Sequence, residues 1–92
     1  MKSLEKLINS MPVESDIYGN KVKPTAFIGE DDFGRNRIML SAEHENSYLF
    51  ADYYGDYRGG FPWVHPALEA WAKKHGFFWE WQNPGALMLC KI

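Results

Sequence analysis

The chain of 92 residues has one cysteine, Cys90, and lacks any apolar run long enough to cross a membrane. A single cysteine excludes an intramolecular disulfide and an all-cysteine metal site, which is typical of proteins from a reducing cytoplasm. The first residues are polar and do not resemble the apolar segment of a secretory signal. We therefore expect a soluble cytoplasmic protein without membrane contact.

Charge of one sign is also missing, since ten basic and twelve acidic residues leave a formal net charge of -2. The overall charge therefore indicates neither a polybasic nucleic-acid binder nor a strongly acidic DNA mimic. The metal-binding patterns HExxH and Cys-x-x-Cys do not occur. Side chains at 43–45 alternate sides if extended, so we interpret His44 as a turn residue, His65 as held by its neighbours and His75 as a helix-end cation. We predict no metal and no cofactor.

Activated nucleophiles are absent as well. The period of two in ALMLCKI places Cys90 on one strand face with Ala86 and Met88, which predicts an inert thiol in the core. No serine lies in a nucleophile-elbow sequence. Asp52 and Asp56 could form a carboxylate pair, but only their spacing supports it. We therefore expect a protein that is not an enzyme.

Aromatic residues are abundant, and twelve of the fifteen lie between Tyr48 and Trp81. They surround a predicted helix at 66–75, which begins at Pro66 and stops before Gly76. Its apolar stripe consists of four residues at helical spacing: Leu68, Trp71, Ala72 and His75. A strand at 77–82 follows, with Phe77, Trp79 and Trp81 on one face. Pro84 and Gly85 then predict a turn in which Gly85 adopts a positive φ, before a return strand up to Ile92.

The N-terminal half predicts one more helix and three strands. Ser3 can cap a helix at 3–11 whose apolar face comprises Leu4, Leu7, Ile8 and Met11. Strands are predicted at 21–28, where Pro24 indicates a sheet edge, and at 37–42 and 48–54, joined by a hairpin connection at 43–46. The whole chain is thus predicted as one small α+β domain, an antiparallel sheet of about four to five strands covered by two short helices.

Two segments are candidates for partner binding. Tyrosine, tryptophan and arginine are the residues that most often anchor interfaces. The Gly/aromatic loop at 55–65 and the strand end before it are rich in them and carry seven candidate residues: Tyr53, Tyr54, Asp56, Tyr57, Arg58, Phe61 and Trp63. The glycines of this loop also fit plain tight turns, a phosphate-binding loop or an RNA-binding segment. The acidic run Glu30, Asp31 and Asp32 could bind a basic surface of a partner, or could simply form a solvated loop.

The block at 51–85 resembles the C-terminal part of small, mostly uncharacterised proteins carried by bacteriophages and plasmids of Gram-negative bacteria. The similarity rests on the tyrosine and glycine loop, Pro62 and Trp63, the helix residues Leu68 and Trp71, and the segment from Trp79 to Gly85. Chain length and the compact α+β layout are also similar to phage anti-CRISPR proteins, including inhibitors of type I-F surveillance complexes. This resemblance implies a non-enzymatic inhibitor acting in the host cytoplasm.

Two functional hypotheses follow. In the first, the protein binds a ribonucleoprotein complex of the CRISPR type, with contacts that can include the guide RNA, and blocks target DNA. In the second, it is a small nucleic-acid-binding or regulatory module of a mobile element. Its contacts would be Arg58, the tyrosines and a basic strip of Lys21, Lys23, Arg35 and Arg37.

Overall fold

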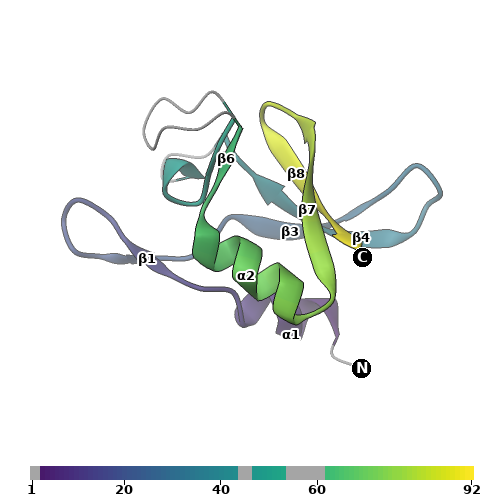
Figure 1. Cartoon of the computed structure of the whole chain (residues 1–92), viewed down its shortest axis with the longest axis horizontal. Helices are drawn as coiled ribbons and strands as arrows, with labels where there is room; N and C mark the ends of the chain where they lie inside the picture. Colours follow the sequence, from purple (N-terminus) through teal and green to yellow (C-terminus); the bar gives the residue numbers. More distant parts are fainter. Residues whose placement is uncertain (1–2, 44–46, 54–61) are drawn as a thin grey trace.

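The computed structural model describes residues 3–43, 47–53 and 62–92 (Figure 1). Two helices, eight strands and one short 3₁₀ helix occur in these ranges. Their order is α1 (Leu4–Asn9), β1 (Glu14–Ser15), β2 (Lys21–Val22), β3 (Ala26–Glu30), β4 (Asn36–Ser41), η1 (Ser47–Leu49), β5 (Ala51–Asp52), β6 (Trp63–Val64), α2 (Pro66–Lys74), β7 (Phe77–Asn83) and β8 (Ala86–Lys91). The predicted α+β class is confirmed.

The main sheet has four antiparallel strands in the order β3-β4-β8-β7. Met39 on β4 pairs with both Phe27 on β3 and Met88 on β8, and Met88 in turn pairs with Glu80 on β7. The predicted C-terminal hairpin is confirmed, with β7 and β8 joined at Pro84 and Gly85. Two further strand pairs, β1 with β2 and β5 with β6, lie outside this sheet.

Both helices pack on one face of the sheet, as the period of two in its strands requires (Figure 1). Ile38, Leu40, Leu87 and Leu89 point from the sheet into the core. Leu7 and Met11 reach it from the α1 side, and Leu68, Trp71 and Ala72 reach it from α2. The helix stripes expected from the sequence are therefore the ones that are buried.

The ends of α2 follow from local chemistry. Pro66 occupies the first turn, where its missing N–H costs nothing. His65 caps the helix because its Nδ1 accepts a hydrogen bond of 2.9 Å from the backbone N–H of Ala67. Gly76 ends it with φ of 84°. Ser3 caps α1 in the same way, by accepting from the N–H of Lys6.

Two strand predictions in the N-terminal half are wrong. The predicted strand at 21–28 is divided into β2 and β3 on either side of Pro24, which has no N–H to donate. The predicted strand at 48–54 is a 3₁₀ turn followed by the two-residue β5. Leu49, Phe50 and Ala51 are all buried, which a half-exposed strand cannot achieve. β5 pairs with β6 and not with β4, so β4 and β5 are not the two arms of a hairpin. Of the predicted connection at 43–46, residues 44–46 lie outside the described residues.

The role expected of Gly85 also needs correction. Positive φ angles occur in the described part of the chain at Gly19, Gly34 and Gly76, and Gly85 is not among them. A Cβ at Gly85 would instead overlap the side chain of Glu43. A larger residue at this position would therefore require the exposed side chain of Glu43 to move aside.

Candidate partner-binding surfaces

Of the predicted recognition loop, Tyr53 and Trp63 are described, and both are half-buried. The ring of Tyr53 meets the edge of Trp81 with centroids 5.2 Å apart, and the ring of Trp63 lies 5.7 Å from His65. Both side chains therefore contribute to packing around β5 and β6. The other five candidates, Tyr54, Asp56, Tyr57, Arg58 and Phe61, lie outside the described residues.

The acidic run lies at the turn between β3 and β4, and its three carboxylates have different surroundings. Asp31 Oδ1 accepts from the backbone N–H groups of Phe33 and Arg35 at 2.9 and 3.0 Å. Its Oδ2 pairs with Arg37 Nε at 3.0 Å and Arg35 Nε at 3.3 Å. The hydrogen bond from Arg35 N–H is the main reason that the pKa of Asp31 falls to about 2. Asp31 thus builds the turn, whereas Glu30 and Asp32 are exposed.

This turn has a structural copy that the sequence interpretation missed. Asp16 Oδ1 accepts from the N–H groups of Tyr18 and Asn20 at 2.9 and 2.8 Å, just as Asp31 does two and four residues on. Gly19 and Gly34 follow with φ of 82° and 75°. The aromatic residue of each turn, Tyr18 or Phe33, is 81% exposed. The repeated spacing Asp-x-aromatic-Gly at 16–19 and 31–34 is the sequence signal that could have identified Tyr18 and Phe33 as exposed turn residues.

Aspartate and glycine are required by this turn geometry, but an aromatic residue between them is not. Tyr18 and Phe33 both project into solvent from turns held by several hydrogen bonds. Little conformational entropy is therefore lost if such a ring enters a partner's pocket. Phe33 also carries the guanidinium of Arg35 over its ring, 5.1 Å from the centroid.

The sheet face opposite the helices, called here the outer face, is apolar at its centre. It comprises Phe27, Met39, Met88, Cys90 and Phe78, with Glu80 at the edge strand. Phe27 and Phe78, on the two edge strands, are 48% and 44% exposed. The three residues between them are half-buried. No described element covers this face.

A hollow of about 220 Å³ lies where the outer face meets the 31–35 turn. Its lining combines the acidic run and Phe33 with Arg35, Arg37, Met39, Gln82 and Met88. Gly29 contributes to the space, because a Cβ there would come within 2.9 Å of Met39 Cγ. Acidic, aromatic and flexible apolar groups thus converge at one end of the sheet.

The predicted basic strip is not assembled. Lys21 belongs to the β1–β2 pair at one end of the molecule, whereas Arg35 and Arg37 lie at the β3–β4 turn at the other end (Figure 1). The long axis of the molecule measures 37 Å. Both arginines are also paired with Asp31. A nucleic-acid backbone would therefore not meet these four cations as one surface.

The two described histidines, His65 and His75, make contacts that support the fold. His65 Nε2 pairs with the Glu14 carboxylate, and His75 is at the C-terminal cap of α2 with its ring 5.2 Å from that of Trp71. His44 lies outside the described residues. In the described ranges, no group of three or more His, Cys, Asp or Glu side chains is arranged to hold a metal ion.

Cys90 shares a face with Ala86 and Met88 as predicted, but that face is the outer one, so the prediction of a core thiol is wrong. Leu87 and Leu89 occupy the core face instead. Burial raises the pKa of the Cys90 thiol, and the nearby Glu80 carboxylate, 3.9 Å from Sγ, raises it further. Its thiolate is therefore disfavoured.

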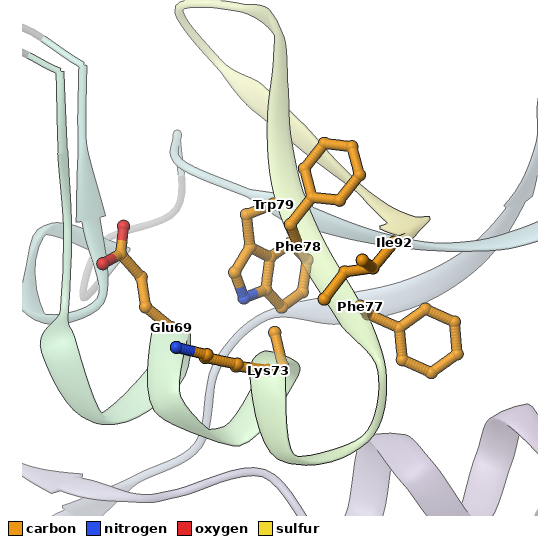
Figure 2. Close-up of a pocket in the computed structure, with 7 residues that line it drawn as sticks. Glu69, Lys73, Phe77, Phe78, Trp79 and Ile92 are labelled. Atoms are coloured by element: carbon orange, nitrogen blue, oxygen red, sulfur yellow. The ribbon is translucent and has the colours of Figure 1, made fainter.

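A second hollow, of about 280 Å³, lies between α2 and β7. Figure 2 shows Glu69 and Lys73 on the helix side and Trp79 on the strand side. The other lining residues are apolar: Ala72, Phe77, Phe78 and Ile92. Glu69 and Lys73 are exposed, so this groove offers an apolar contact and no activated group.

Comparison of the chain with protein-family models, with curated proteins and with solved structures finds no match. Among the described residues, no helix combines the length and the apolar character that crossing a membrane requires.

Proposed function

We propose that this protein is a phage-encoded, non-enzymatic inhibitor that binds a protein or ribonucleoprotein complex in the cytoplasm of a bacterial host. The observation that carries the proposal is the exposed ring of Phe33, held by Asp31 beside exposed carboxylates and next to the uncovered apolar outer face. Preorganised aromatic residues bordering an apolar surface are typical of protein interfaces. The most concrete form is an anti-CRISPR protein that keeps target DNA from a type I-F surveillance complex.

A protein partner is favoured over free nucleic acid for an electrostatic reason. Glu30 and Asp32 line the same hollow as Phe33 and would repel phosphate groups, while the two arginines there, including the one over the Phe33 ring, are paired with Asp31. A partner surface that carries lysine or arginine would be attracted instead.

The test uses a purified type I-F surveillance complex and labelled target DNA. We expect DNA binding to be lost as the protein approaches one or a few copies per complex, without any dependence on incubation time. Unchanged DNA binding at large excess would remove the anti-CRISPR form of the proposal. Loss at far lower ratios that grows with time would indicate turnover and contradict a non-enzymatic mechanism.

The same assay tests the predicted recognition loop. If Tyr57 and Arg58 are anchors, Tyr57→Ala combined with Arg58→Ala should weaken inhibition about thirtyfold, which corresponds to roughly 2 kcal/mol. The melting temperature of the double variant should stay near that of the wild type. Equal inhibition by both proteins would show that this loop is not the main contact.

A further inference from the structure

We propose that the outer face docks a segment of a partner protein that is both apolar and basic. An antiparallel sheet with one free face usually places polar side chains there. Here Met39, Met88 and Cys90 of the two central strands lie on that face, between phenylalanines on the two edge strands. Arg37 lies on the same side of β4 as Met39 and is paired with Asp31. This row of apolar side chains would be costly to leave in water and fits an apolar partner surface.

The charged residues around the outer face indicate the sign of the charge that a partner should carry. Glu30, Asp32 and Glu80 are exposed at its border. Arg35 and Arg37 both pair with Asp31, which leaves one positive charge in excess, so Glu30, Asp32 and Glu80 together with this group carry a formal charge of -2. A partner segment with lysine or arginine side chains would complement these carboxylates.

The hollow at the 31–35 turn suits the shape of such side chains. Met39 and Met88 line it and can adapt to the aliphatic part of a lysine or arginine, and the exposed carboxylates of Glu30 and Asp32, which line it too, can pair with the charged end. The absence of a Cβ at Gly29 leaves room for Met39. An amphipathic basic segment therefore matches both the apolar and the acidic residues that line this hollow.

A second copy of this chain fits less well. Two outer faces brought together would oppose the same exposed carboxylates, and like charges across an interface repel. A phosphate-bearing ligand meets the same repulsion. The observations thus favour a basic protein segment as the occupant.

The test uses a short amphipathic helical peptide of leucine and lysine, with a leucine and glutamate peptide of the same pattern as control. The readout is NMR of protein labelled at the methionine methyl groups. The Met39 and Met88 signals should shift on addition of the lysine peptide, while the buried Met11 serves as an internal control and stays in place. The glutamate peptide should cause no shift.

A matched pair of variants makes the assignment specific. Met88→Lys places a cation on the outer face and should weaken binding of the lysine peptide at least about tenfold. Ile17→Lys adds the same charge at an exposed position in the 16–20 turn and should change it little. Equal weakening by both variants, absent shifts of Met39 and Met88, or equal shifts with the glutamate peptide would overturn the proposal.

NMR spectra of the protein alone at several concentrations test whether two copies associate through the outer face. Concentration-dependent shifts of Met39 and Met88 without peptide would assign the outer face to a second copy and overturn the proposal. The inference names the partner chemistry for the binding function proposed above and rests on it. Its test needs no surveillance complex, so failure with the peptide and failure of the inhibition assay are distinguishable.

Discussion

Asp31 orders the turn that carries Phe33. Its side chain is 7% exposed and accepts hydrogen bonds from two backbone N–H groups and from Arg37. Each of these bonds favours the charged form, which is why the pKa of Asp31 falls from 3.8 to about 2. A carboxylate whose pKa is lowered by folding stabilises the folded state above its ordinary pKa. That contribution is lost as the pH falls from about 4 to about 2.

We therefore expect Asp31→Asn to lower the melting temperature at neutral pH. The asparagine side chain is uncharged, and its NH2 group cannot accept a hydrogen bond as the second carboxylate oxygen does. The difference from the wild type should shrink as the pH is lowered towards 2, where the wild-type carboxyl is also neutral. Thermal melts across this pH range measure it. Asp32→Asn is the matched control at an exposed neighbour and should have little effect. A difference that stays constant down to pH 2 would contradict the role assigned to the charge.

At the scale of the element, α2 connects the sheet with α1 through Trp71. The indole Nε1 of Trp71 donates to Ser10 Oγ at 3.0 Å, and its ring lies 6.1 Å from that of Trp79. Only 7% of the residue is exposed. Its removal would leave a cavity shared by two helices and the sheet.

Trp71→Ala should reduce the free energy of unfolding by about 3–5 kcal/mol. This is a large part of the roughly 5–15 kcal/mol that stabilises a typical domain. Urea unfolding at equilibrium measures the change. Lys74→Ala, on the exposed side of the same helix, should change stability by no more than about 0.5 kcal/mol. Similar losses in both variants would show that the helix does not pack through Trp71.

The helix α2 could be predicted from the sequence because each of its determinants is local. Pro66, Gly76 and the stripe around Trp71 are all contained in one segment of the chain. The segment from Tyr48 to Asp52 could not, because its alternation of residues fits a strand but its burial depends on distant partners. The hydrogen bond of 2.7 Å from His65 N–H to the carbonyl of Phe50 is one such contact.

At the scale of the whole molecule, the two similar turns lie at opposite ends (Figure 1). Phe33 borders the outer face through the hollow that it shares with Met39 and Met88. Tyr18 lies in the turn between β1 and β2, a strand pair that is separate from the main sheet. A partner on the outer face should therefore contact one turn and not the other.

Phe33→Ser should weaken binding of the leucine and lysine peptide by about tenfold, whereas Tyr18→Ser should leave it unchanged. Both variants should keep the wild-type melting temperature to within a few degrees, since each ring is 81% exposed. Peptide titration and thermal melts measure the two effects. If Tyr18→Ser weakens binding as strongly, the partner lies elsewhere on the molecule.

The candidate surface was only partly predictable. The acidic run at Glu30 to Asp32 was recognised from its charges, but the inward role of Asp31 depends on the turn that brings Arg35 and Arg37 to it. The outer face was not recognised at all. Four strands contribute to it, and β4 and β8, which pair in the sheet, are far apart in the sequence because β4 ends at Ser41 and β8 begins at Ala86.

The sequence by itself determined both helices, strand β4 and the hairpin of β7 with β8, because spacing, caps and turn residues act over a few positions. It also determined that Cys90 shares a face with Met88, since side chains alternate along any strand. Only the tertiary structure decided which of the two faces is buried. Leu40 pairs with Leu87 across β4 and β8, and the helices cover that side because both strands present leucine there. That long-range pairing leaves Cys90, Met39 and Met88 on the open side of the sheet.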